Sequence, residues 1–126
     1  IEFEPDLDWA WNGRGVTLSQ MARHEDALFS FSKAVELNKG DVWHWYHYAD
    51  EQYTLNKLAD ALVSLDEALK INNRHVESWA KRGQTLRRLG RHNEALTAFD
   101  LAVRLNPQYA WAWNGRGLAL EALSRR

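Results

Sequence analysis

A 34-residue periodicity constrains the fold of this chain more than any other feature. Six sets of similar residues recur at this interval in one common register. They are tryptophans (Trp11, Trp45, Trp79, Trp113), small residues (Gly15, Ala49, Gly83, Gly117), two sets of alanines (Ala27, Ala61, Ala95; Ala34, Ala68, Ala102), large apolar residues (Phe31, Leu65, Phe99) and asparagines (Asn38, Asn72, Asn106). Because a fixed period of 20–50 residues is typical of stacked supersecondary units, the sequence predicts a repeat architecture.

Each repeat contains two stretches in which apolar or small residues recur every three or four positions. In the third repeat they are Trp79, Gly83 and Leu86, followed by Ala95, Leu96, Phe99, Ala102 and Val103. This spacing indicates amphipathic helices, whereas no stretch alternates with the period of a strand. We therefore predict helices at about 7–21, 25–38, 41–55, 59–72, 75–89, 92–105 and 109–123.

The break between the two helices of a repeat is short enough to make a helical hairpin. In the third repeat Gly90 suits a left-handed C-cap, and we expect Asn93 to cap the following helix. The small residues mark the closest approach of the helices, with Trp79 and Phe99 filling the space beside them. If such a tryptophan is fully buried, its replacement by alanine costs roughly 3–5 kcal/mol.

These columns resemble the tetratricopeptide repeat (TPR) family. The third repeat matches its pattern best, through Trp79, Gly83, Leu86, Gly90, Ala95, Phe99, Ala102 and Pro107. The second repeat is the most divergent, with Gln52 at a usually apolar position and Asn73 in place of proline. The resemblance implies an all-α fold, a right-handed superhelical solenoid of antiparallel helix hairpins.

The register divides the chain into repeats at residues 8–41, 42–75 and 76–109. Residues 1–7 correspond to the tail of a preceding repeat, and residues 110–126 to the first helix of a fourth repeat or to a capping helix. That last segment carries Trp111, Leu118, Leu120 and Leu123, so we expect its outer face to be incompletely covered. An uncovered apolar face favours self-association.

Composition argues against several classes of function. The net charge of −1 creates no global field for nucleic acid or an anionic membrane, and no run of 18 apolar residues is present. Basic residues are not repeated in every unit, as arrays that read RNA one base at a time require. There is no cysteine, which excludes thiolate chemistry and fits a reducing compartment. We expect a cytoplasmic protein with no cofactor, nucleic-acid partner or membrane partner.

In the TPR family the first helix of each hairpin lines a concave groove that binds peptides. The resemblance implies that this groove contains Trp9, Asn12, Trp43, Tyr46, His47, Asp50, Tyr53, Lys81, Gln84, Arg87, Arg88, Trp111 and Asn114. Trp43, Tyr46 and Tyr53 would anchor a partner, since aromatic residues dominate binding hot spots. The alternative is that these rings pack against neighbouring repeats.

Charge is distributed unevenly along the chain. Residues 1–70 contain 6 basic and 13 acidic residues, a net charge of −7, whereas residues 71–126 contain 10 and 4, a net charge of +6. Lys81, Arg87 and Arg88 could orient an acidic segment of a partner. Two alternatives are ion pairs between neighbouring repeats, for example Asp50 with Lys81, and head-to-tail association of opposite ends.

One TPR subtype holds chaperone C-terminal tails with a clamp of lysine, asparagine and arginine residues. The resemblance places Asn12, Val16, His47, Glu77 and Lys81 at the clamp positions. Only Lys81 matches in type, and Glu77 would repel a carboxylate. We therefore do not expect this subtype.

Enzymatic chemistry has little support. His44, His47 and Glu51 are spaced at i, i+3 and i+7, but the spacing of a helical zinc site is missing. No phosphate-binding loop and no credible nucleophile is found, so we expect no metal and no catalytic residue. The sequence predicts an interaction scaffold that binds a protein or peptide segment, the alternatives being a self-associating repeat fragment or the regulatory arm of a larger enzyme whose catalytic domain is absent.

Overall fold

The computed structural model describes residues 7–125, which form helices and no strand. The helices are α1 (Leu7–Gln20), α2 (His24–Leu37), α3 (Val42–Thr54), α4 (Leu58–Ile71), α5 (Val76–Arg88), α6 (His92–Leu105) and α7 (Ala110–Ser124). Every predicted helix is confirmed to within one residue at each end. Of the tail predicted at residues 1–7, only Leu7 is described, and it begins α1; the repeat boundaries stay a prediction.

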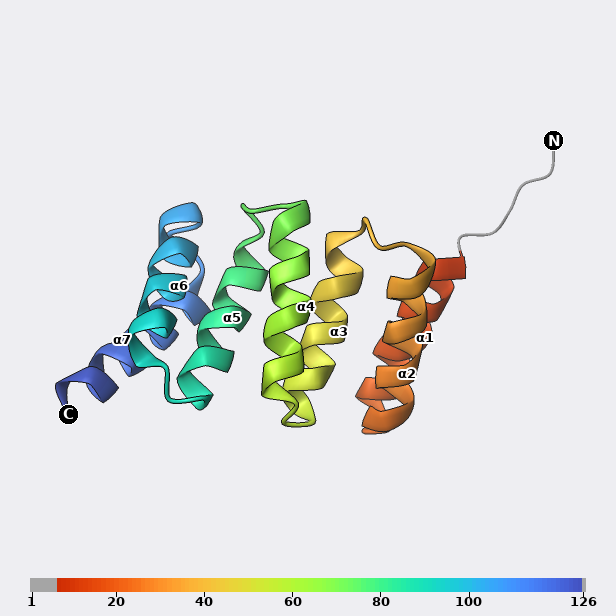
Figure 1. Ribbon diagram of the computed structural model, residues 1–126, viewed down its shortest axis with the longest axis horizontal. Coiled ribbons are helices and arrows are strands. Elements are labelled where there is room, and N and C mark those ends of the chain that lie inside the picture. Colours follow the sequence, from red (N-terminus) through yellow and green to blue (C-terminus); the bar gives the residue numbers. More distant parts are fainter. Residues whose placement is uncertain (1–6, 126) are drawn as a thin grey trace.

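The helices form hairpins that follow one another along the long axis of the molecule (Figure 1). The first helices pack against one another, since α1 contacts α3, α3 contacts α5 and α5 contacts α7. Among the described residues, α2 and α4 have no Cα atoms within 8 Å of each other, and neither have α4 and α6. Helices on the inner side of a curved stack must lie closer together than those on the outer side. The layer of α1, α3, α5 and α7 is therefore the concave one.

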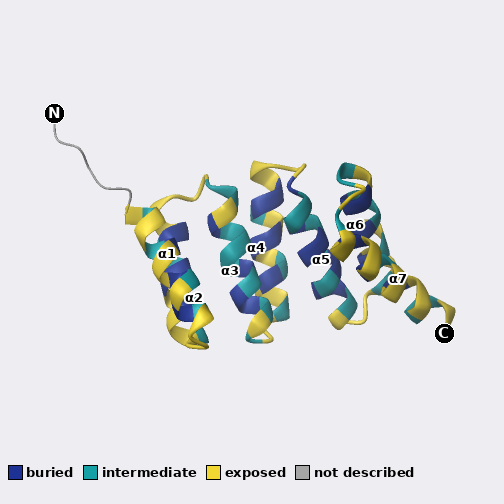
Figure 2. Ribbon diagram, turned by 180° about the vertical axis from the view of Figure 1, so that it is seen from behind, coloured by how far each residue is buried: buried dark blue, intermediate teal, exposed yellow. Residues whose placement is uncertain are grey.

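The core lies between the two layers and is built on small residues (Figure 2). Alanines at repeated positions are completely buried, and Phe99 is the largest fully buried side chain. A Cβ atom added at Gly83 would lie 2.8 Å from the Phe99 ring, so the two helices can approach this closely only because Gly83 has no side chain. The prediction that small residues mark the closest approach is confirmed here.

The turn inside each hairpin uses one left-handed residue. Ala22, Asn56 and Gly90 have φ angles of 60°, 63° and 79°, and they are 34 residues apart. The left-handed conformation predicted for Gly90 is confirmed. The cap predicted at Asn93 is wrong: α6 begins at His92 with Arg91 as its N-cap, so Asn93 lies within the first turn, two residues after the cap.

The asparagine column forms the turn between repeats. Asn38, Asn72 and Asn106 end α2, α4 and α6, and each side-chain Oδ1 accepts a hydrogen bond from the backbone N–H two residues later, at 3.0–3.1 Å. This Asx turn redirects the chain into the next hairpin, which explains why asparagine recurs there.

The repeated tryptophans are less buried than the sequence suggested. The Trp79 ring packs against a buried cluster that includes Ala80 and Val103, but it stays half-buried, and Trp113 is 48% exposed. The indole Nε1–H of Trp45, Trp79 and Trp113 donates to the backbone carbonyl six residues earlier, at 2.8–2.9 Å. Because the indole N–H of each ring is hydrogen-bonded to the turn between repeats, these tryptophans can hold that turn without being fully buried.

No helix in the described part of the chain is long and apolar enough to span a membrane.

Candidate functional site

The concave layer presents three exposed tryptophans from one position of the repeat. Trp9 on α1, Trp43 on α3 and Trp111 on α7 are 42%, 38% and 55% exposed. The third repeat has Glu77 at this position. Asn114 is exposed on the same helix as Trp111. The predicted groove residues thus lie on four neighbouring helices of one layer.

Two of the exposed rings, Trp9 and Trp43, also pack against the following repeat, so both alternatives raised by the sequence describe part of their surface. The Trp9 ring lies 4.5 Å from the His44 ring, and the Trp43 ring lies 4.5 Å from the His75 ring, measured between centroids. Tyr46 packs edge-on to Trp43 at 5.7 Å and to His75 at the same distance. Trp9 and Trp43 therefore each bury part of the ring against a histidine and leave the rest accessible.

Burial changes the acid–base properties of this aromatic cluster. Desolvation raises the pKa of the Tyr46 hydroxyl, and the charge of Asp50 adds to the shift. Desolvation also lowers the pKa values of His47 and His75, because the neutral ring tolerates a low-dielectric environment better than the charged ring does. The cluster is thus most stable with uncharged rings, which suits apolar and aromatic contacts.

Lys81 ties the second repeat to α7. Its Nζ atom lies 2.9 Å from Asp50 Oδ1, 4.7 Å from the centre of the Tyr53 ring and 5.2 Å from the centre of the Trp111 ring. Lys81 is only 5% exposed, so its charge is directed into the chain. The predicted ion pair of Asp50 with Lys81 is present. Lys81 cannot meet a partner directly unless this arrangement opens.

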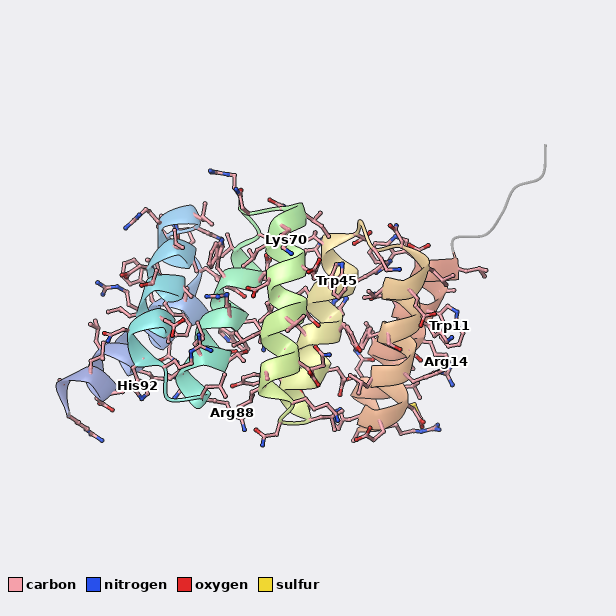
Figure 3. All side chains as sticks on the ribbon, in the orientation of Figure 1. Trp11, Arg14, Trp45, Lys70, Arg88 and His92 are labelled. Atoms are coloured by element: carbon pink, nitrogen blue, oxygen red, sulfur yellow. The ribbon has the colours of Figure 1, made fainter. Side chains whose placement is uncertain are left out.

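Arg88 and Arg87 lie further along α5. Arg88, which is labelled in Figure 3, donates to Asn56 Oδ1 at 3.0 Å. It also stacks over Tyr53, with its guanidinium carbon 4.8 Å from the ring centre. Arg87 Nε and Gln84 Oε1 are buried and have no hydrogen-bond partner among the described residues. Arg88 is exposed, so it stays accessible to a bound segment although it is already hydrogen-bonded.

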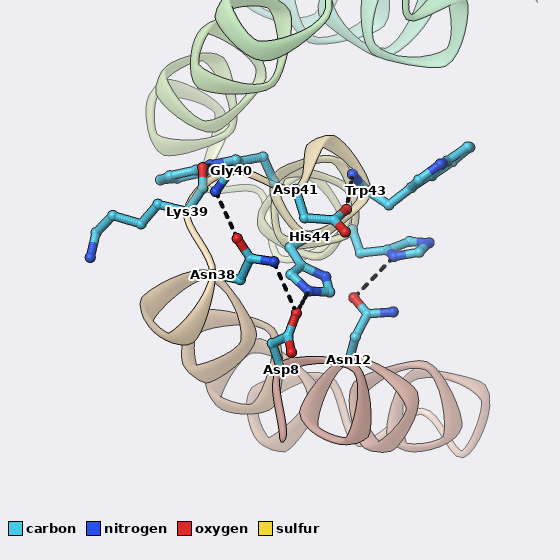
Figure 4. Close-up of polar contacts among 10 residues, drawn as sticks. Asp8, Asn12, Asn38, Lys39, Gly40, Asp41, Trp43 and His44 are labelled. Atoms are coloured by element: carbon cyan, nitrogen blue, oxygen red, sulfur yellow. Dashed lines mark hydrogen bonds and ion pairs between the residues drawn. The ribbon is translucent and has the colours of Figure 1, made fainter. Parts of the chain in front are cut away.

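The junction between the first two repeats is polar (Figure 4) and partly buried. His44 Nε2 donates to Asp8 Oδ2 at 2.9 Å, and His47 Nδ1 donates to Asn12 Oδ1 at 3.2 Å. The bond from His44 lowers the pKa of the Asp8 carboxyl. Asn12 is 4% exposed, so it supports His47 and does not itself face solvent.

The spacing of His44, His47 and Glu51 does not bring the three side chains to one point. Each pairs with a different residue of the first repeat, and Glu51 Oε2 accepts a 2.6 Å hydrogen bond from His24 Nδ1. Within residues 7–125, no group of three or more such side chains is arranged to hold a metal ion.

A pocket of about 410 Å³ opens between α1 and α3 in the concave layer. Its lining consists of Val16, Ser19, Gln20, Phe31, His47, Asp50 and Glu51. Phe31 comes from α2 and forms the floor, with its ring stacked on His47 at 5.7 Å. The concave layer therefore has a pocket beside His47 and Asp50.

Several residues that shape the site were not anticipated. Asp8 and His75 hold His44 and Trp43, yet each lies more than 30 residues from its partner in sequence. Their only signal is their place in the repeat: His75 directly precedes a first helix, and Asp8 lies at the start of one. Pairings between repeats depend on how neighbouring hairpins stack, and the sequence of a single repeat does not specify this stacking.

The helix hairpins, their curvature and the lined concave layer define a superhelical solenoid protein. Sequence profiles agree: one described as TPR repeat matches residues 83–124, and one described as tetratricopeptide repeat matches residues 10–41. The chain belongs to the tetratricopeptide repeat family. A comparison with curated protein sequences found no match.

Solved structures share this fold at low sequence identity. The first TPR domain of Spaghetti (RPAP3) bound to the HSP90 peptide SRMEEVD aligns with a TM-score of 0.92 and 18% identity over 98% of each chain. The second TPR domain of human RPAP3, in complex with the HSP70 peptide SGPTIEEVD, aligns with a TM-score of 0.85 and 18% identity over 90% of this chain and 94% of that one. YrrB, described as a TPR protein with an unusual peptide-binding site, aligns with a TM-score of 0.84 and 20% identity over 87% and 57%.

Proposed function

We propose that this chain is an interaction scaffold, not an enzyme, and that its concave groove binds an extended or helical segment of another protein. The observation that carries the proposal is the row of exposed tryptophans, Trp9, Trp43 and Trp111, at one repeat position of the concave layer. Exposed indoles lose the benefit of burial in the free protein and gain it on binding. The peptides bound to two proteins of the same fold support this use of the groove.

In this proposal the groove residues divide into two groups. Trp9, Trp43, Trp111, Arg88 and Asn114 contact the partner directly, because their side chains are exposed. The others shape the groove: Asn12, Tyr46, Tyr53 and Lys81 act through the contacts described above, and Gln84 and Arg87 are half-buried side chains of α5. His47 and Asp50 make such contacts too, but they also line the pocket between α1 and α3, where part of their surface is open to a partner.

The bound segment differs in chemistry from an acidic chaperone tail. Asn12 is hydrogen-bonded to His47, and Lys81, the one clamp position that matches in type, is paired with Asp50. Glu77 adds a negative charge beside the groove. These residues disfavour a partner carboxylate, in agreement with the sequence.

The proposal is tested by selecting peptides from a phage-displayed random library on the immobilised 126-residue chain. We expect Trp43→Ala to weaken the binding free energy of the selected peptides by at least about 1 kcal/mol, because an aromatic hot spot is lost. Calorimetry measures this change. Phe29→Ala is the matched control, since Phe29 is an aromatic residue on α2 in the outer layer and is 54% exposed. Equal affinities for the unchanged chain and Trp43→Ala would refute the proposal.

A second candidate function is self-association through α7. Trp113, Leu118 and Leu120 on α7 are 48%, 39% and 40% exposed, and exposed apolar side chains gathered on one helix favour association. Light scattering over a concentration series is the test. We expect a dimer or larger species that reverts to monomer when Leu118 and Leu120 are both changed to lysine. A monomer at every concentration of the unchanged chain would contradict this candidate.

A further inference from the structure

The pocket between α1 and α3 has a chemical bias that the tryptophan row lacks. Two of its seven lining residues, Asp50 and Glu51, are carboxylates, and Ser19 and Gln20 add uncharged polar groups. None of the residues that line it, all within the described range, is lysine or arginine. The pocket therefore concentrates hydrogen-bond acceptors and negative charge on one stretch of the groove.

Both carboxylates have acceptor capacity left over. Glu51 is 3% exposed, and its Oε2 accepts from His24, but no residue among 7–125 donates a hydrogen bond to its Oε1. The Asp50 side chain is 46% exposed, and only its Oδ1 is engaged by Lys81. An ionised carboxylate offers about four lone-pair sites, so the pocket can accept further N–H groups without breaking the existing pairs.

Lys81 offsets only one of the two carboxylates of the pocket, because it pairs with Asp50 and not with Glu51. Lys81 lies between Asp50, Tyr53 and Trp111, is almost fully buried and is not among the residues that line the pocket. The part of the chain that surrounds the pocket is acidic as well, since residues 1–70 carry a net charge of −7 (6 basic and 13 acidic residues). Local and regional charge thus have the same sign.

We propose that this pocket receives a basic side chain, lysine or arginine, of the segment bound in the groove. The inference rests on the proposed function and specifies its partner. Asp50 and Glu51 accept the hydrogen bonds of the ammonium or guanidinium group, and Phe31 and His47 supply ring surface against which its aliphatic stem packs. The long-range field of the acidic half steers such a segment into the groove.

The experiment uses the peptides selected on the intact chain, with each arginine replaced by citrulline and each lysine by glutamine. We expect one basic position at which the replacement weakens binding about tenfold or more, because a charge-assisted hydrogen bond in a pocket is lost.

The protein is varied in parallel at Gln20, an exposed pocket residue. Gln20→Lys should weaken binding about two- to fivefold relative to the uncharged control Gln20→Met, and Gln20→Glu should strengthen it. The peptide in which citrulline or glutamine replaces this basic residue should bind Gln20→Lys and Gln20→Met with equal affinity.

The two proposals fail in different ways. One result would overturn the basic-residue pocket and still support peptide binding in the groove. In that result, binding depends on Trp43 but tolerates every citrulline or glutamine replacement, and the affinities for Gln20→Lys and Gln20→Met are equal. Peptides that are indifferent to Trp43→Ala would refute the groove itself, and the pocket with it.

Discussion

At the scale of single residues, the three hairpin turns show how one backbone conformation is met by three different side chains. Ala22, Asn56 and Gly90 occupy equivalent left-handed positions. Glycine adopts this conformation without a steric penalty and asparagine tolerates it, whereas alanine is strained by about 1–2 kcal/mol. The first turn is therefore the weakest of the three.

Replacing Ala22 with glycine should stabilise the protein. We expect the free energy of unfolding to rise by about 0.5–1 kcal/mol, because relief of the left-handed strain exceeds the added entropy of the unfolded chain. Urea denaturation followed by circular dichroism measures the change. The reciprocal variant Gly90→Ala should lose a similar amount, and a loss of stability in Ala22→Gly would contradict the interpretation.

His47 provides a residue-scale test of the buried junction. Burial lowers its folded-state pKa below the ordinary value of about 6.5. Neutral His47 therefore contributes stability that is fully present above pH 6.5 and is lost as the pH falls through the folded-state pKa. An NMR titration of the imidazole ring should give a midpoint below 6.5. The difference in melting temperature between the unchanged chain and His47→Gln should shrink from pH 7.5 to pH 5.5, and a midpoint above 6.5 would contradict this prediction.

At the scale of helices, the stacking geometry depends on the points at which one helix contacts the next. Phe99 on α6 is enclosed by Gly83 of α5 in its own hairpin and by Gly115 of α7 in the next. Two ion pairs join the second helix of one repeat to the first helix of the next: Asp66 pairs with Arg82 at 3.0 Å, and Asp100 pairs with Arg116. Exposed pairs of this kind contribute roughly 0–1 kcal/mol each, so the apolar contacts decide the geometry.

Gly115 and Gly117 lie two residues apart on α7 and should respond oppositely to alanine. A Cβ atom at Gly115 would overlap the Phe99 ring, whereas a Cβ atom at Gly117 would meet nothing within 4 Å. We expect Gly115→Ala to lower the free energy of unfolding by about 1–3 kcal/mol through overpacking. Gly117→Ala should raise it by up to about 1 kcal/mol through helix propensity. Thermal denaturation of both variants is the measurement, and equal shifts would show that α7 does not pack on Phe99 as described.

At the scale of the whole molecule, stability should fall toward the ends of the array. Each hairpin contacts only its neighbours, so the central helices are supported on both sides. Among the described helices, α7 packs on α5 and α6 alone, and it leaves one face exposed (Figure 2).

Native-state hydrogen exchange tests this gradient. We expect amides of α7 to exchange at least tenfold faster than those of α4 and α5, because local opening of an end helix breaks fewer contacts than opening of the centre. The comparison is internal, since all helices are measured in one sample. Uniform protection from α1 to α7 would mean that the array unfolds as a single cooperative unit.

The sequence alone determined the architecture of this protein. A helical period within each repeat and the 34-residue period between repeats were sufficient to locate the helices, because both depend on local spacing and on small residues at close approaches. The divergence at Gln52 was also visible, although its explanation was not: a buried hydrogen bond from Ser64 Oγ, at 2.7 Å, satisfies its amide oxygen.

Only the tertiary structure decided which groove residues remain accessible. Asn12 and Lys81 occupy the same kind of repeat position as other groove residues, yet both are buried by partners supplied from an adjacent repeat. The half-exposed indoles of Trp9 and Trp43 likewise depend on His44 and His75, which lie more than 30 residues away in the chain. Accessibility is a property of stacked neighbours, and a sequence period specifies which positions face the groove but not which side chains of the next repeat cover them.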